Sequence, residues 1–122
     1  MKSLLIVGSV FAALSVLLGA FGAHGLKNRL SIEDLAIFET AVRYQMYHAL
    51  GILLMGLASI DLTEKLVSTP AYFLILGIIV FSGSLFLLVF TNLRWFGAIT
   101  PIGGLCLIIG WLLFAYNIYF HA

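Results

Sequence analysis

LVSTPAYFLILGIIVFSGSLFLLVFTNL, residues 66–93, carries no charged side chain over its whole length. A lipid bilayer has a hydrocarbon core about 30 Å thick, which an apolar helix of about 20 residues crosses. Inside that core every backbone N–H and C=O group needs a partner within the protein, so a chain crosses it as a helix or as a strand of a closed barrel. The alternation of apolar and polar residues that barrel strands require is absent here. The stretch therefore predicts a transmembrane helix.

Three further uncharged runs flank this stretch, and the composition of the whole chain agrees with them. Apolar residues make up 63% of the 122 residues, charged residues make up 9%, and the mean hydropathy is +1.18. A soluble domain has about a quarter of its residues charged. We expect an all-α fold, an integral membrane four-helix transmembrane bundle, with residues 1–122 forming a single membrane domain. The expected spans are residues 3–23, 42–60, 70–91 and 98–119.

The first run also has features of a secretory signal peptide, because Lys2 precedes it and the small-residue sequence Ala20-Phe21-Gly22-Ala23 ends it. Its apolar stretch is longer than the usual core of a signal peptide, which favours a span. Small residues recur every three or four positions in it, and Gly residues recur in the last span. The residues expected to let helices pack closely are Gly8, Ala12, Ser15, Gly19, Gly103 and Gly110. So many small-residue faces also predict a homo-oligomer.

Residues 26–43 hold most of the charge and lead into the second span. Ser31 followed by Asp34 forms an N-terminal capping box, so a helix is expected to begin near Ile32. A helix from there to residue 60 would be about 43 Å long, so its first turns should lie outside the hydrocarbon. Its apolar residues fall along one side, which predicts an amphipathic interfacial segment. Whether this segment bends into the span near Arg43 stays open.

Two Thr-Pro pairs are expected to mark helix starts, since proline is favoured at the first helical position. Thr69-Pro70 predicts the start of the third span in this way. For Thr100-Pro101 two interpretations are open: the fourth helix begins at Pro101, or it begins near Trp95 and is kinked by the proline. The first is favoured, and it makes residues 94–99 an interfacial or re-entrant connection.

Lysine and arginine residues are distributed unevenly between the two sides of the membrane. Four lie on one side and two on the other, namely Lys27, Arg29, Arg43 and Arg94 against Lys2 and Lys65. Because cytoplasmic loops carry the excess of such residues, the count predicts a multi-pass protein of the cytoplasmic membrane with both termini outside.

Few polar side chains occur at membrane depth, where they are costly and often functional. On a helix, Tyr44, Gln45 and His48 share one face, and His24 ends the neighbouring span, so we expect these four residues to form a polar ligand or proton site. For His48 the favoured interpretation is a histidine whose hydrogen bond to a neighbouring helix satisfies it, and a proton relay or ligand site is the alternative. Glu39 and Arg43 are spaced as an i to i+4 ion pair at the membrane interface.

The sequence lacks the residue patterns that a metal site, a disulfide, a catalytic centre or a nucleic-acid interface would need. His24, His48 and His121 are too few and too scattered for a zinc site, so no metal and no cofactor is predicted. Cys106 stands alone, no catalytic residue is apparent, and Ser82-Gly83-Ser84 is expected to bond across helices. The six basic and five acidic residues nearly cancel without a basic stripe, so the expected partner is the lipid bilayer and not nucleic acid.

Four sequence blocks, in this order and spacing, resemble the YgdD/YwdK family of small bacterial membrane proteins. They are GAFGAHGL at 19–26, YQMYHAL at 44–50, FSGSL at 81–85 and GAITPIGG at 97–104. The resemblance implies four spans and supplies no established activity, cofactor or catalytic residue, and its blocks include His24 and the face of Tyr44, Gln45 and His48.

Three functions follow as hypotheses from these residues. The favoured one is a non-enzymatic protein that binds lipid or a small apolar ligand, or assists membrane organisation, in the groove between the first two helices. The alternative is an oligomeric pathway for a small solute or protons through His24 and His48. An enzyme or a haem subunit comes third.

Overall fold

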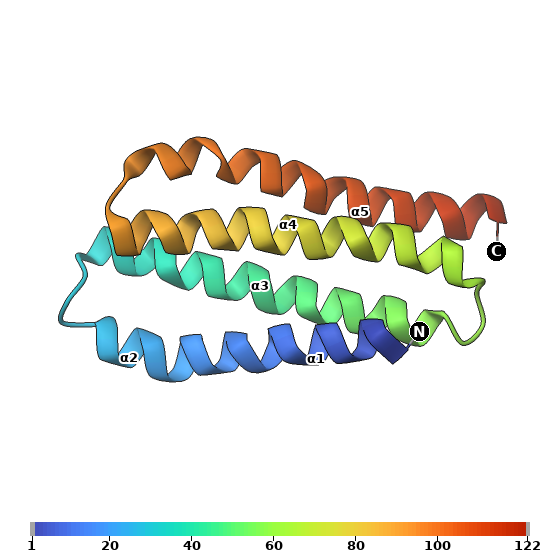
Figure 1. Cartoon of the computed structure of the whole chain (residues 1–122), viewed down its shortest axis with the longest axis horizontal. Helices are drawn as coiled ribbons and strands as arrows, with labels where there is room; N and C mark the ends of the chain where they lie inside the picture. The colour runs from blue at the N-terminus through green and yellow to red at the C-terminus, as the bar shows by residue number, and fades with distance from the viewer. Residues whose placement is uncertain (1, 122) are drawn as a thin grey trace.

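Four long helices make up the fold in a computed structural model, which describes residues 2–121. The elements are α1 (Lys2–Val16), the π-helical segment η1 (Leu17–Gly22), α2 (Ala23–Leu26), α3 (Ile32–Ala58), α4 (Glu64–Thr91), the 3₁₀ segment η2 (Arg94–Ala98) and α5 (Thr100–His121). The first three form one continuous rod. The long helices run antiparallel and lie side by side in chain order, so α1 packs on α3, α3 on α4 and α4 on α5 (Figure 1). The predicted all-α membrane bundle is confirmed.

Three of these helical segments are long and apolar enough to cross a membrane: Lys2–Leu26, Glu64–Thr91 and Arg94–His121. Helix α3, the expected second span, is not among them. Its fourth and fifth turns carry polar side chains, including Arg43, Gln45 and His48, which lower its mean hydropathy. It nevertheless lies between α1 and α4 and is as long as its neighbours (Figure 1).

Helix α3 begins at Ile32, as predicted, because Ser31 caps it: the Asp34 backbone N–H donates to Ser31 Oγ at 3.1 Å. The helix continues through Arg43 without interruption, so the segment expected at the interface is the first part of α3 itself (Figure 1). Phe38 in this segment is fully buried, with its ring centroid 5.6 Å from that of Phe86 on α4, whereas Ile32 is 86% exposed. The segment therefore packs on the bundle through Phe38.

The predicted start of α4 at Thr69-Pro70 is wrong. The helix begins at Glu64, and Pro70 lies in its interior. An interior proline removes the hydrogen bond to the carbonyl four residues earlier, here that of Leu66. Asn117 on α5 replaces the missing donor, since its Nδ2 donates to the Leu66 carbonyl oxygen at 2.9 Å. Because this carbonyl is satisfied, the helix can include the proline.

The start of α5 agrees to within one residue with the favoured interpretation, because the helix begins at Thr100 and the proline occupies its first turn. The residues before it form the 3₁₀ segment η2, not the first turns of a kinked helix. Asn92 ends α4 in the left-handed conformation with φ 58° and ψ 18°, and its backbone N–H donates to the Leu88 carbonyl oxygen at 2.9 Å.

Small residues set the closest approaches between helices. A Cβ atom added at Gly103 would collide with the backbone of Phe81 on α4, coming within 2.7 Å of its Cα. A Cβ atom at Gly8 would lie 3.0 Å from the Ala49 carbonyl oxygen on α3. The remaining packing candidates differ in their surroundings: Gly110 lies against Pro70 and Leu74, Ser15 is buried, Gly19 faces Val42 and Ala12 is half-buried. The buried apolar core comprises Leu4, Ile52, Met55, Val67, Ala71, Leu74, Ile78, Leu107 and Phe114.

Candidate functional site

Buried polar side chains connect neighbouring helices through backbone carbonyls or hydroxyls. Gln45 Nε2 on α3 donates to the Phe11 carbonyl oxygen on α1 at 3.1 Å. Ser82 Oγ on α4 donates to the Ala41 carbonyl oxygen on α3 at 2.7 Å. Ser84 Oγ and Thr100 Oγ1 form a hydrogen bond of 2.6 Å between α4 and α5. The predicted bonding of the serines across helices is confirmed, and Gln45 serves the contact between α1 and α3.

His48 is 8% exposed and packs among aromatic rings. Its Nδ1 lies 2.7 Å from the Tyr44 carbonyl oxygen, and because a carbonyl only accepts, Nδ1 carries the hydrogen. In the neutral ring, Nε2 is then an acceptor. Ring centroids of Tyr44 and Trp111 lie 6.1 and 6.0 Å from that of the imidazole. The ring therefore bonds within its own helix.

The structure does not bring His24 and His48 together. His24 is exposed on α2, close to Gly22, which packs against Phe38 on α3. His48 lies ten residues further along α3, which corresponds to roughly 15 Å of helix. The expected site shared by His24, Tyr44, Gln45 and His48 is therefore split. Gln45 faces α1, Tyr44 stacks on Phe81, and His48 lies beside Trp111. His24 lies near the end of the bundle.

The expected Glu39–Arg43 ion pair is absent among residues 2–121; both side chains are exposed, and the pair that forms there joins Asp34 to Arg94. Arg94 Nη1 and Nη2 donate to the two Asp34 carboxylate oxygens at 2.9 and 3.1 Å, and Nη2 also donates to Asn92 Oδ1 at 2.5 Å. The hydrogen bond from Arg94 lowers the pKa of the Asp34 carboxyl. This pair attaches the start of α3 to the connection between α4 and α5.

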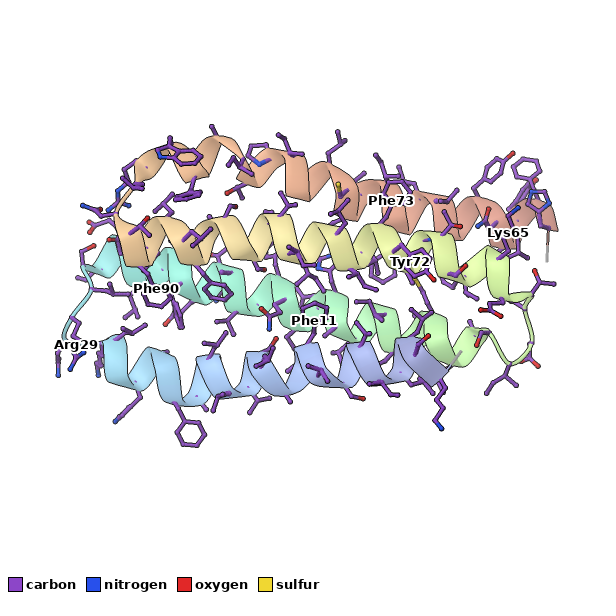
Figure 2. The ribbon with its side chains drawn as sticks, viewed as in Figure 1. Phe11, Arg29, Lys65, Tyr72, Phe73 and Phe90 are labelled. Atoms are coloured by element: carbon purple, nitrogen blue, oxygen red, sulfur yellow. The ribbon has the colours of Figure 1, made fainter. Side chains whose placement is uncertain are left out.

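An apolar groove, here called the α1 groove, opens where the first helical rod ends. Its volume is about 410 Å³, and its lining residues are Leu18, Phe21, Gly22, Gly25, Leu26, Arg29, Phe38 and Phe90. Arg29 is the one charged residue in this lining, and Figure 2 shows it on the loop at the end of the bundle. The groove therefore combines a hydrocarbon surface with a cation at one end.

The π-helical turn η1 shapes the first part of this groove. The Ala23 N–H donates to the Leu18 carbonyl oxygen five residues earlier, in place of the usual four. Gly22 lets Phe38 approach, since an added Cβ atom would lie 3.2 Å from Phe38 Cζ. Nothing lies within 4 Å of a Cβ atom at Gly25. Wide π turns are often found at functional sites.

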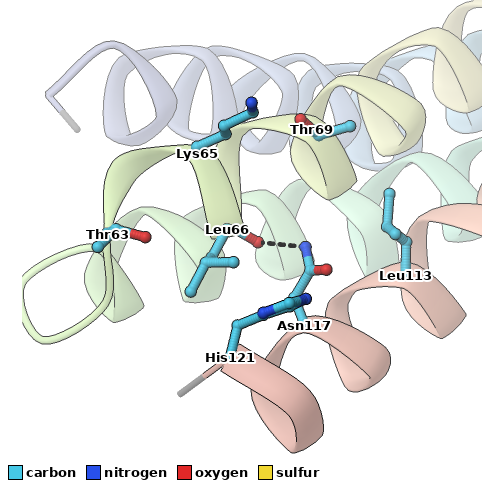
Figure 3. A pocket seen from close by; sticks show the side chains of 7 residues that line it. All are labelled: Thr63, Lys65, Leu66, Thr69, Leu113, Asn117 and His121. Atoms are coloured by element: carbon cyan, nitrogen blue, oxygen red, sulfur yellow. Dashed lines mark hydrogen bonds between the residues drawn. The ribbon is translucent and has the colours of Figure 1, made fainter.

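A second cavity, here called the α4–α5 pocket, lies at the opposite end of the bundle. It has a volume of about 530 Å³ and is lined by Thr63, Lys65, Leu66, Thr69, Leu113, Asn117 and His121. Figure 3 shows Asn117 between the two helices, with its hydrogen bond to Leu66. Sequence reasoning missed this pocket, because it depends on Pro70 lying inside α4 and on a contact between residues 51 positions apart.

These features define a small, multi-pass helical membrane protein. Residues 18–104 match the family described as a protein of unknown function (DUF423), and the chain belongs to this family. It is 49% identical over 113 residues to a UPF0382 membrane protein of Staphylococcus saprophyticus, and 93% of each chain is covered. It is 42% identical over 118 residues to the UPF0382 membrane protein YwdK of Bacillus subtilis, again with 93% of each covered. The resemblance to YwdK is confirmed; no solved structure matches the chain significantly.

Proposed function

We propose that this protein is a non-enzymatic lipid-binding protein of the cytoplasmic membrane, and that the α1 groove holds an acyl chain of an anionic phospholipid. The groove itself carries the proposal, because its lining is apolar except for Arg29 at one end. A phospholipid has the same arrangement, with an apolar chain that ends in a charged headgroup. In this proposal the phosphate lies against the guanidinium, since a guanidinium can bind phosphate through two parallel hydrogen bonds.

The position of the groove along the bundle supports this assignment. Lys27 and Arg29 lie at the same end, where Arg94 is paired with Asp34 and Glu33 is a further acidic residue, so Lys27 and Arg29 are the cations available to attract anionic lipids. Lys27 and Arg29 form no ion pair within residues 2–121. We place this end in the cytoplasm, and we expect α3 to cross the membrane with the three apolar segments because α1 and α4 cover it on two sides.

The alternative, a solute or proton pathway through His24 and His48, lacks comparable support. The two histidines lie at different depths of the bundle, and the buried polar atoms of residues 2–121 all have hydrogen-bond partners. A relay needs polar groups that can exchange partners along a continuous line. Bonds to backbone carbonyls, such as that of Gln45, hold the side chains in place instead.

Native mass spectrometry of the full chain with phosphatidylglycerol and phosphatidylcholine tests the lipid assignment. Wild-type protein should retain phosphatidylglycerol preferentially, and Arg29→Gln should weaken that binding about fivefold, because one cation near the headgroup contributes about 1 kcal/mol. The matched control is Lys27→Gln, which removes the same charge at the same end but does not line the groove. The same spectra give the oligomer mass and so test the expected homo-oligomer.

A second variant separates the chain-binding part of the groove from its charge. In Gly25→Leu a side chain enters space that is empty at this position, so both lipids should be lost, whereas Arg29→Gln should remove only the preference for the anionic one. Equal lipid retention by wild type, Arg29→Gln and Gly25→Leu would refute the proposal. If a variant loses lipid, an unchanged circular dichroism spectrum and elution volume show that misfolding did not cause the loss.

A further inference from the structure

The α4–α5 pocket is separate from the α1 groove and opens at the other end of the bundle. Figure 2 shows Lys65, from the pocket, and Arg29, from the groove, at opposite ends of the molecule. The described ends of the chain also lie at the pocket end (Figure 1). Any ligand in this pocket would therefore meet the membrane surface opposite to the one that the groove faces.

Two helices build this pocket from their terminal turns. Its α4 residues come from the first two turns and the residue before them, and its α5 residues come from the last turns (Figure 3). Asn117 spans the space between the helices and uses its Nδ2 to bond the carbonyl that Pro70 leaves without a donor. This bond holds the Asn117 side chain in place in the pocket lining, and Leu66 and Leu113 contribute apolar side chains to the same lining.

Four lining residues remain, the imidazole-bearing His121 and three whose side chains are suited to an anion. Lys65 contributes an ammonium group, and Thr63 and Thr69 contribute hydroxyl donors. Thr63 precedes α4, and its hydroxyl oxygen accepts no cap hydrogen bond, so the whole hydroxyl group, including its O–H donor, is uncommitted to the helix end. Among residues 2–121 no carboxylate side chain lines the pocket, although Asp61 and Glu64 lie nearby in the sequence. A cation and hydroxyl donors in a lining without a carboxylate side chain are a combination that binds phosphate.

We propose that the α4–α5 pocket binds a phosphate group, with Lys65 as its charged partner and the Thr63 and Thr69 hydroxyls as additional donors. The phosphate belongs either to a phospholipid headgroup or to a free phosphate ion. The apolar walls formed by Leu66 and Leu113 accommodate the first carbons of a lipid next to its phosphate. This site is independent of the lipid that we propose for the α1 groove.

Phosphorus NMR titration of the full chain in detergent tests this site with two probes, inorganic phosphate and dihexanoyl phosphatidic acid. Lys65→Gln should weaken phosphate binding about tenfold, as expected for the loss of one charge-assisted hydrogen bond. The matched control, Lys2→Gln, removes the same charge at the same end without lining the pocket, and it should leave the affinity within about twofold. Both variants should keep the wild-type circular dichroism spectrum.

The two probes distinguish the sources of the phosphate. Comparable binding of both identifies a free-phosphate site, and binding of dihexanoyl phosphatidic acid alone identifies a headgroup site. Titration of Arg29→Gln protein separates this pocket from the α1 groove, because the Lys65-dependent binding should persist in it. The proposal fails if neither probe binds, or if Lys65→Gln and Lys2→Gln weaken binding equally.

Discussion

The two outer helices of the bundle, α1 and α5, are attached to their neighbours in different ways. Helix α5 lies on α4 through glycines that bring the two backbones together, and polar side chains bond the pair near both ends, at Thr100 and Asn117. Helix α1 approaches α3 closely at Gly8 and bonds it once, through Gln45. Beyond that point the first rod changes to a π turn, and the α1 groove opens beside it.

We expect this difference to place most of the stability in one contact and the proposed lipid binding beside the other. A close-packed contact leaves no room for a ligand, and its residues tolerate little change in volume. A contact that includes a groove contributes less buried surface. A lipid in such a groove could be exchanged while the remaining helix contacts stay intact. Variants that alter one contact and leave the other unchanged therefore measure how much each contact contributes to the stability of the bundle.

The largest effect is expected at the contact between α4 and α5. In Gly103→Ala the new Cβ atom would collide with the Phe81 backbone, which cannot rotate away, so unfolding free energy should fall by about 3 kcal/mol. Gly83→Ala is the matched control, since nothing lies within 4 Å of its added Cβ atom and helix propensity should make it neutral or stabilising by up to about 1 kcal/mol. Thermal unfolding in detergent, followed by circular dichroism, measures both. Equal stability of the two variants would contradict the close packing.

A smaller effect is expected for Asn117→Leu, which leaves the Leu66 carbonyl oxygen without a donor and should cost about 1–3 kcal/mol. Pro70→Ala restores the N–H group that this carbonyl lacks. In the Pro70→Ala background, Asn117→Leu should therefore cost clearly less than it does alone. A double-mutant cycle of thermal or denaturant unfolding gives the coupling between the two residues. Additive costs would show that Asn117 does not compensate for the proline.

The smallest effect concerns the Asp34–Arg94 pair, which is exposed on its arginine side. The arginine lowers the pKa of the Asp34 carboxyl, so the pair contributes stability above the ordinary aspartate pKa and loses it as the pH falls through the lowered value. The melting temperature of the wild type should therefore fall on acidification below about pH 4. Asp34→Asn should melt slightly lower at neutral pH and lose part of this dependence on pH. Identical pH profiles for the two proteins would exclude a contribution from the pair.

Local signals allowed much of the fold to be predicted from the sequence. Uncharged runs identified the long helices, and the spacing of Ser31 and Asp34 gave the first residue of α3, because a capping box lies within a few residues of the end that it caps. Ser82 and Ser84 were expected to bond across helices because buried hydroxyls need partners.

The errors share a physical cause: a partner that lies far away in the sequence. Pro70 indicated a helix start, but Asn117 compensates for its missing N–H group. Asp34 was assigned to the cap alone, and its carboxylate in fact binds Arg94, 60 positions away. Glu39 was paired with Arg43 by helical spacing, and His24 was joined to His48 because it ends the neighbouring span. Neither signal gives the depth at which another helix meets a side chain.

The π turn in the first rod also affects how sequence changes act on this protein. Such a turn contains one residue more than an α-helical turn, so it rotates everything beyond it by about 100° relative to a regular helix. With this extra residue in place, Gly8 and Gly22 both face α3, Gly8 at Ala49 and Gly22 at Phe38. Removal of a single residue between 17 and 22 would turn the groove-lining side chains away while the contact of Gly8 with α3 stayed in register. Evolution can thus adjust the groove independently of the contact that anchors the helix.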